Sequence, residues 1–257
     1  MNQLLSQIEN IVRECGNIIL SVKPDEMAIS DKEGIGNIVT QYDGKIQETL
    51  KHELLALIPD AAFVGEEEEL HTAVLQNGYT FIVDPIDGTY NFATGWRMSA
   101  VSIALLKDGA PYLAVCYNPY ADEMFTAEKG CGAYLNGTPI HVSNKRLCEG
   151  IFIAGSAPYY LELRERTTKL FGSFFAHAAD FRAIGSAVIE ICAIACGRVE
   201  AYYDLRLQPW DYAAAMLILQ EAGGTVTTID GNEMRFDAPS SILASNGAED
   251  YLVYTRV

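Results

Sequence analysis

The sequence predicts a layered α/β or α+β sandwich in which mixed sheets alternate with helices. Helical periodicity dominates the first 58 residues, strand and turn patterns follow to about residue 142, and helices then alternate with strands. A parallel doubly wound sheet would alternate strands and helices from the start. The 257 residues, 49% of them hydrophobic, are enough for one large core or two modest ones.

Two helices are predicted near the N-terminus. Apolar residues recur at helical spacing over 4–19 and again over 46–58, with Thr40 or Asp43 as the cap of the second helix. The polar segment 22–38 between them contains a proline and two glycines, so we expect a loop or a mobile arm there.

Strands joined by short turns are expected after the second helix. The dipeptide Asp108-Gly109 is typical of a two-residue hairpin turn, and strand and turn patterns continue beyond it. The expected strands in this region are 62–64, 79–83, 98–106 and 111–117.

The C-terminal region alternates helices with strands. Polar residues at 144–150 mark a soft boundary inside what we expect to be a single unit of residues 1–257, with an α+β half before it and an α/β half after it. Helices are expected at 161–170, 186–196 and 210–222, and strands at 199–203, 224–229 and 241–244.

Charge and cysteine content limit the partners and the location. The net charge is −16, with 34 acidic and 18 basic residues, which argues against a nucleic acid polymer as the main partner. None of the six cysteines forms a Cys-x-x-Cys pair, and no apolar run has membrane-spanning length. Charged residues interrupt the N-terminal apolar residues, unlike in a signal peptide. We therefore expect a cytoplasmic protein with no membrane partner.

The segment DPIDGT at 84–89 is the most informative part of the sequence. It follows an apolar run that is predicted to be a buried strand, so Asp84 and Asp87 leave the strand end three residues apart. Pro85 stiffens the loop, and Gly88 allows a sharp turn before a hydroxyl residue. Two carboxylates in this setting suggest a hard-cation site that holds a phosphate.

Other acidic residues also follow predicted elements. Asp43 follows an extended stretch, Glu66 and Glu67 follow a strand, and Asp211 lies at the start of a helix. Each has a plain structural alternative. An acid at a helix start stabilises the helix dipole, and the acidic run 66–69 suits a solvated surface.

The spacing of the two aspartates argues against other phosphate chemistries. Phosphatases that form an aspartyl-phosphate carry Asp-x-Asp-Gly-Thr, whereas Asp84 and Asp87 are three residues apart with a proline between them. No Gly-Lys-Ser or Gly-Lys-Thr of a Walker phosphate loop follows them.

Together these motifs resemble the inositol monophosphatase family of magnesium-dependent, lithium-sensitive phosphomonoesterases. The matching segments, in the family's order, are VTQYD at 39–43, GEEEE at 65–69, DPIDGTYNF at 84–92 and WDYAAAMLILQEAGG at 210–224. The resemblance covers about residues 4–250. It implies an αβαβα sandwich of the sugar-phosphatase type with mixed sheets, two or three Mg²⁺ ions per active site, lithium inhibition and a homodimer.

The resemblance also implies roles for individual residues. Glu66 and Thr89 would act on the nucleophilic water, Asp43 would hold Thr89 in place, and the backbone N–H groups of Gly88 and Thr89 would meet the phosphate. Lys32, eleven residues before Asp43, matches a loop lysine of family members. The implied metal ligands are Glu66, Asp84, Asp87, Asp211 and the backbone carbonyl of Ile86.

Substrate contacts are implied by a Gly-Ser-Ala segment and by two acids. Asp204 takes a position at which inositol-handling members typically carry glutamate, and its side chain is one methylene shorter. Arg182 is either a further lining residue or a structural or interface cation. The residues expected to contact the substrate are Gly185, Ser186, Ala187, Asp204 and Asp211.

The expected reaction is hydrolysis of a small polyol or sugar phosphate, of the inositol 1-phosphate type, by direct in-line attack of a metal-activated water. None of the four histidines falls in a matched motif, and oxygen ligands suit Mg²⁺ better than zinc. Alternative substrates are a nucleotide 3′-phosphate such as 3′-phosphoadenosine 5′-phosphate, histidinol phosphate and fructose 1,6-bisphosphate. A non-catalytic binding module of the same fold would be expected to lose a ligand acid or Thr89, and none is lost.

Overall fold

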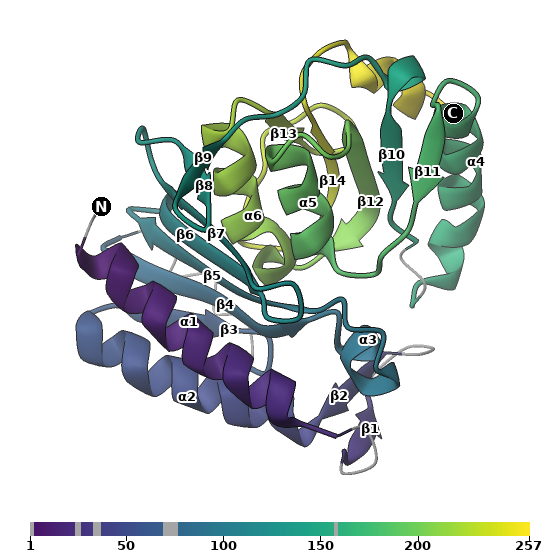
Figure 1. The fold of residues 1–257 in the computed structure, drawn as a ribbon. Coiled ribbons are helices and arrows are strands. Elements are labelled where there is room, and N and C mark those ends of the chain that lie inside the picture. The colour runs from purple at the N-terminus through teal and green to yellow at the C-terminus, as the bar shows by residue number, and fades with distance from the viewer. Residues whose placement is uncertain (1–2, 24–26, 33–36, 69–76, 157–158) are drawn as a thin grey trace.

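The computed structural model describes residues 3–23, 27–32, 37–68, 77–156 and 159–257. These residues form five layers in the order helices, sheet, helices, sheet, helix (Figure 1). The layered α+β architecture with mixed sheets is therefore confirmed. The loop or arm expected at 22–38 is described only in part, because its proline and its two glycines lie outside the described residues. Glu69, the last residue of the acidic run 66–69, also lies outside them.

Helices α1 (Gln3–Ser21) and α2 (Gln41–Leu57) lie side by side on one face of the first sheet (Figure 1). Both are amphipathic, as their apolar periodicity predicts, and their buried faces pack on the sheet as one hydrophobic cluster. Asp43 is fully buried in the first turn of α2, where its side chain forms a capping box with Thr40.

The first sheet has seven strands in the order β3-β4-β5-β6-β7-β8-β9. The pair β3–β4 is parallel, and the other neighbouring pairs are antiparallel. The predicted hairpin at Asp108 and Gly109 is confirmed, since both residues have positive φ angles, 51° and 77°, between β5 and β6. The strands are β3 (Ala62–Gly65), β4 (Tyr79–Asp87), β5 (Ala100–Lys107), β6 (Ala110–Asn118), β7 (Glu123–Glu128), β8 (Ala133–Leu135) and β9 (Thr138–Ile140).

Helices α5 (Ala187–Ala195) and α6 (Pro209–Glu221) lie between the two sheets (Figure 1). A helix covered on both sides has no solvated face, which is why α6 is apolar nearly all round and almost completely buried. The largest hydrophobic cluster of the described residues joins these helices to both sheets.

The second sheet has five strands in the order β11-β10-β12-β14-β13. Strand β10 pairs in parallel with β11 and β12, and β14 pairs antiparallel with β12 and β13. Helix α4 (Arg164–Phe175) covers its outer face over an aromatic cluster (Figure 1). The strands are β10 (Ile151–Ala154), β11 (Asp180–Arg182), β12 (Ala201–Leu207), β13 (Thr225–Thr227) and β14 (Ser240–Ser245), and the 3₁₀ helices are Leu147–Glu149, Leu161–Leu163 and Tyr251–Thr255.

Three short strands lie where the sequence shows no strand or extended pattern. Strand β1 (Ile29–Asp31) lies in the segment expected to be a loop and pairs antiparallel with β2 (Ile38–Thr40). All three residues of β1 are exposed, so they carry no apolar pattern. Strands β10 and β11 have four and three residues, which is too short for periodicity to identify them. Among the described helices, none is both long enough and apolar enough to cross a membrane.

Candidate active site

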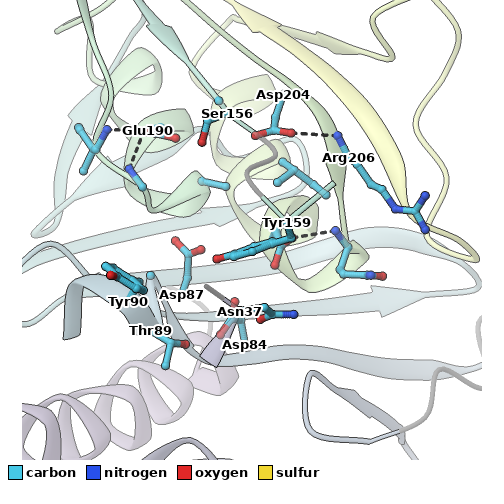
Figure 2. A pocket seen from close by; sticks show the side chains of 18 of the residues that line it. Asn37, Asp84, Asp87, Thr89, Tyr90, Ser156, Tyr159, Glu190, Asp204 and Arg206 are labelled. Atoms are coloured by element: carbon cyan, nitrogen blue, oxygen red, sulfur yellow. Dashed lines mark hydrogen bonds between the residues drawn. The ribbon is translucent and has the colours of Figure 1, made fainter. Parts of the chain in front are cut away.

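A cavity of about 540 Å³ lies where the end of β4, the start of α6 and the second sheet meet. Figure 2 shows Asp84 and Asp87 on one side of this cavity and Asp204 on the other, with the Tyr159 ring between them. The cavity thus brings together acids from segments that are far apart in the sequence. Its lining includes all of the predicted metal-ligating residues, namely Glu66, Asp84, Ile86, Asp87 and Asp211.

A β-bulge in β4 sets the directions of its two acids. Asp84 pairs with Ser102 of β5 and Asp87 pairs with Ala100, so β4 has one residue more than its partner. The bulge is closed by the Ile86 N–H, which donates to Asp84 Oδ1 at 2.9 Å. Without a bulge, residues three apart in a strand would point to opposite faces, and here both line the cavity.

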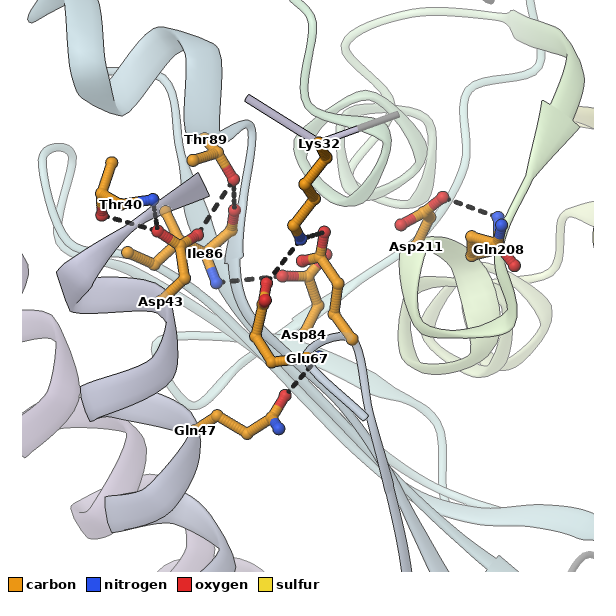
Figure 3. A network of polar contacts seen from close by, with 11 residues as sticks. Lys32, Thr40, Asp43, Gln47, Glu67, Asp84, Ile86, Thr89, Gln208 and Asp211 are labelled. Atoms are coloured by element: carbon orange, nitrogen blue, oxygen red, sulfur yellow. Dashed lines mark hydrogen bonds and ion pairs between the residues drawn. The ribbon is translucent and has the colours of Figure 1, made fainter. Parts of the chain in front are cut away.

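Asp211 joins these two acids from the other half of the chain. Carboxylate oxygens of Asp84, Asp87 and Asp211 lie within 4.8 Å of one another. Asp211 is the third residue of α6, and its Oδ2 accepts from the Gln208 N–H at 2.7 Å in a capping box (Figure 3). Asp211 can therefore cap α6 and also belong to the acidic cluster, because only its Oδ2 accepts the capping bond and its second carboxylate oxygen does not.

The pKa values of these three acids are raised because the carboxylates are buried and crowded together. Burial and the neighbouring acids raise the pKa of Asp84 and of Asp211 well above the ordinary value, and burial raises the pKa of Asp87 to about 7. Among the described residues, no Lys or Arg forms an ion pair with any of the three. A divalent cation would offset this repulsion, and an all-oxygen donor set suits a hard ion such as Mg²⁺.

Lys32 reaches the cavity from the segment after β1. Its Nζ lies 2.9 Å from Glu66 Oε1 and 2.6 Å from Glu67 Oε1 (Figure 3). Burial lowers the pKa of Lys32, but the two glutamates outweigh burial and keep the pKa above its ordinary value. Glu66 lines the cavity but is not one of the three acids whose oxygens lie within 4.8 Å of one another.

Thr89 is held at the start of α3 (Thr89–Thr94) by two acceptors. Its Oγ1 lies 3.1 Å from Asp43 Oδ1 and 3.1 Å from the Ile86 carbonyl oxygen. The other carboxylate oxygen of Asp43 accepts from the Thr40 N–H at 2.8 Å and from the Thr40 hydroxyl at 2.6 Å. Gly88 precedes Thr89 with φ of +85°, and a Cβ there would lie 2.9 Å from a backbone carbonyl oxygen, so the turn requires glycine.

Of the predicted substrate contacts, Gly185 and Ala187 line the cavity, whereas Ser186 is buried behind it. The Ser186 hydroxyl donates to Asp87 Oδ2, and the Val188 N–H donates to the same oxygen at 2.9 Å. Ser186 therefore contacts Asp87 and is not among the described residues that line the cavity, so its expected contact with the substrate stays a prediction.

Asp204 lines the side of the cavity opposite the acidic cluster (Figure 2). It lies at a β-bulge of β12, where its Oδ1 accepts from the Arg206 N–H at 2.9 Å. Its side chain packs directly on the backbone of Gly155. Arg182 pairs with Asp180 at 2.6 Å on the exposed edge strand β11 and is not among the described residues that line the cavity.

Several residues at the site were not singled out from the sequence. Glu190 lines the cavity from within α5, where the other eight residues are apolar, and this isolated acid is a pattern that could have identified it. Asn91 is the second residue after the DPIDGT segment and lies within the matched stretch 84–92, but no role was assigned to it. Tyr159 lies in a segment with no recognisable motif. Glu67, in contrast, was named from the sequence as an acid that follows a strand, but its contact with Lys32 could only be seen in the structure.

Sequence comparisons place this chain close to one enzyme family. A family model described as the inositol monophosphatase family matches residues 1–257. Inositol-1-monophosphatase of Bacillus subtilis is 32% identical over 235 residues, which cover 91% of this chain and 89% of that protein. Nus factor SuhB of Vibrio cholerae is 34% identical over 233 residues, which cover 90% of this chain and 87% of that protein.

Solved structures agree with the sequence comparisons. The extragenic suppressor protein suhB from Bartonella henselae has a TM-score of 0.90 at 30% identity, covering 99% of this chain and 98% of its own. A staphylococcal IMPase-II with inositol monophosphate bound has a TM-score of 0.82 at 28% identity, covering 98% and 94%. A complex of SaIMPase-II with 2′AMP has a TM-score of 0.81 at 29% identity, covering 95% and 91%.

Proposed function

The chain belongs to the inositol monophosphatase family and is a phosphoric monoester hydrolase, and from this premise we propose a Mg²⁺-dependent enzyme that acts on a small polyol or sugar phosphate of the inositol 1-phosphate type. The observation that carries the proposal is the convergence of Asp84, Asp87 and Asp211 within 4.8 Å at a cavity wall. The pKa of each of these acids is raised, which supports a site where a bound cation would stabilise the three carboxylates in their charged form.

The metal ligands we propose come from three parts of the chain. Mg²⁺ bound there would neutralise the phosphate dianion, lower the pKa of a water and stabilise the leaving alkoxide. The ligands would be Glu66, Asp84, Asp87, Asp211 and the backbone carbonyl of Ile86, with two or three ions per site.

Thr89 and Asp43 are proposed to orient the attacking water. A hydroxyl has one proton, so Thr89 Oγ1 donates to either Asp43 or Ile86 and keeps its lone pairs for a water proton. The buried Asp43 is itself held by two bonds from Thr40, which fixes the hydroxyl in direction. Glu66 would accept a proton from the same water in direct in-line attack, without a covalent intermediate.

The phosphate is proposed to sit at the first turn of α3. The first N–H groups of a helix have no partner within the helix, and they attract anions. Gly88 and Thr89 supply such groups next to the acidic cluster. Lys32 adds a positive charge on the same side of the cavity.

The leaving group is proposed to lie against Gly185, Ala187 and Asp204. An acid on this side favours a neutral, hydroxyl-bearing leaving group, because a hydroxyl can donate to Asp204 whereas a second phosphate would be repelled. This ranks polyol phosphates above bisphosphates such as fructose 1,6-bisphosphate. Similar solved structures contain inositol monophosphate or 2′AMP, so a polyol phosphate and a nucleotide are the two ligand types to compare as substrates.

A substrate panel tests the proposal. We expect phosphate release from inositol 1-phosphate that requires Mg²⁺ and is inhibited by Li⁺, with kcat/KM above that for 2′AMP, 3′-phosphoadenosine 5′-phosphate, histidinol phosphate and fructose 1,6-bisphosphate. D87N should abolish release while the protein remains folded. Preference for a nucleotide would overturn the substrate proposal. Mg²⁺ binding by calorimetry without release from any ester would favour a non-catalytic role instead.

Family membership is also the basis on which we propose a homodimer and a cytoplasmic location. Two observations are compatible with them. The edge strand β11 carries the exposed Phe181 beside the exposed Phe175 of α4, and all six cysteines are free. Sedimentation analysis would show twice the 28.2 kDa chain mass if the dimer is correct, and the monomer mass would contradict it.

A further inference from the structure

We propose that Glu190 is a positioning residue that holds the turn 184–186 in place, so that Ser186 and Val188 fix the orientation of Asp87. The proposal rests on the function proposed above, since it assigns to Glu190 an effect on a metal ligand. The catalytic chemistry itself needs no contact with Glu190.

Glu190 is bound to the backbone of the turn. Its Oε1 accepts from the Ile184 N–H at 2.7 Å and from the Gly185 N–H at 3.0 Å. The residue is only 3% exposed and lies in a helix that is otherwise apolar. Figure 2 shows its two dashed contacts with the turn. A buried carboxylate in such a place requires partners, and the turn supplies them.

Asn91 holds the same turn from the opposite layer. Its Nδ2 donates to the Ile184 carbonyl at 2.8 Å and lies 3.3 Å from the Gly185 carbonyl. It also donates to the Met98 carbonyl at 2.8 Å. The N–H groups of the turn are therefore held by Glu190 of α5, and its carbonyl groups by Asn91 of α3.

The turn also packs directly against the backbone that carries Asp87. Gly185 has φ of +83°, and its carbonyl oxygen would lie 3.2 Å from a Cβ added to Gly88. The Ser186 Cβ would lie at the same distance. Movement of the turn would therefore be transmitted at once to residues 87–88.

The consequence for Asp87 is a fixed carboxylate. Oδ2 accepts from both Ser186 and Val188, and Oδ1 carries neither of these bonds. The Ala187 N–H also bonds this carboxylate, so three groups of the segment 186–188 hold Asp87 in one orientation. Residues that orient a metal ligand typically change metal affinity or activity by about 10- to 100-fold when removed. Glu190 contacts the turn and not Asp87 itself, so we expect its removal to have an effect of about tenfold, at the lower end of this range.

The experiment compares E190A with E190Q. Calorimetry on the metal-free protein should show Mg²⁺ affinity about tenfold weaker in E190A, because the turn loses its acceptor. The Mg²⁺ concentration for half-maximal turnover should rise by the same factor, while kcat at saturating Mg²⁺ changes less. E190Q keeps an oxygen that can accept both bonds, so it should recover most of the affinity.

Glu200 provides a matched control. It is a 1% exposed glutamate that also accepts a backbone N–H, from Ile151, and a side-chain bond, from Ser143, but it does not line the cavity. E200A should lower thermal stability without changing Mg²⁺ affinity. If E190A does not fold, N91A removes the other contact of the turn and should weaken Mg²⁺ binding in the same way.

Mg²⁺ affinity and half-maximal Mg²⁺ concentration within twofold of wild type in a folded E190A would overturn the proposal. Equal weakening in E190A and E200A would also overturn it, since the effect would then be a general loss of stability. If the wild-type protein neither binds Mg²⁺ nor releases phosphate, the proposed function fails instead.

Discussion

The Thr89 hydroxyl lies 3.1 Å from Asp43 Oδ1, so the start of α3 is tied to the first turn of α2 (Figure 3). Asp43 is fully buried, and its pKa is raised by burial although the bonds from Thr40 and Thr89 lower it. An acid kept at this cost in the core, next to the DPIDGT segment, indicates a role for the hydroxyl that it holds.

The Thr89 hydroxyl is the first target for mutation. Thr89→Val keeps the branched shape and removes the oxygen, so we expect kcat to fall by about 100- to 1,000-fold because the attacking water loses its orienting partner. Mg²⁺ affinity from calorimetry should stay near the wild-type value. Thr89→Ser keeps the hydroxyl and serves as the control. A valine variant within tenfold of wild-type kcat would contradict the role of Thr89.

The metal-free protein should lose stability as pH rises. The pKa of Asp87 is about 7 when folded and about 4 when unfolded, so the folded state binds more protons between these values. The contribution of Asp87 to the free energy of unfolding is therefore greatest below about pH 4, and it is lost as the pH rises through about 7. Melting temperatures in EDTA, measured from pH 5 to 8, should show this slope.

Two changes should flatten the slope with pH. D87N removes one of the three clustered carboxylates whose pKa is raised, and saturating Mg²⁺ would offset the negative charge of all three. Both should raise the melting temperature near pH 8 by roughly 5 °C. The explanation fails if D87N in EDTA shows the same slope as the wild-type protein.

Removal of the Lys32 charge should strengthen Mg²⁺ binding. The ammonium group already offsets the charges of Glu66 and Glu67, so Lys32→Met leaves more negative charge for the ion. We expect Mg²⁺ affinity to rise by about three- to tenfold in calorimetry. Lys51→Met is the control, because Lys51 pairs with the neighbouring Glu68 and does not line the cavity. Weaker binding in the Lys32 variant would show that Lys32 supports the metal site.

Gly155→Ala should disturb Asp204 without removing it. A Cβ at Gly155 would lie 2.1 Å from Asp204 Oδ2, so the carboxylate must move. We expect KM for inositol 1-phosphate to rise by about tenfold, with a smaller change in kcat, because a leaving-group contact is lost. Gly172→Ala on α4 is the control, since nothing lies within 4 Å of its added Cβ. An unchanged KM would remove Asp204 from the proposed substrate site.

Part of the site could be predicted because its pattern is local. The apolar run before Asp84 predicts the buried strand that became β4, and the DPIDGT segment places both acids at its end. The pattern could not show that β4 continues to Asp87 through a bulge. A bulge depends on how the partner strand β5 is aligned, and that alignment joins residues far apart in the chain.

Sequence alone determined the fold class and the types of residue available for chemistry. Periodicity reports which face of an element is buried, and the spacing of acids reports local backbone geometry. Tertiary structure alone decided which groups meet. It placed Asp211 beside Asp84 and Asp87, directed the Ser186 hydroxyl toward Asp87, and made Glu190 and Asn91 hold one turn between two layers. Such contacts arise when the packed layers bring distant segments together, and no local pattern encodes them.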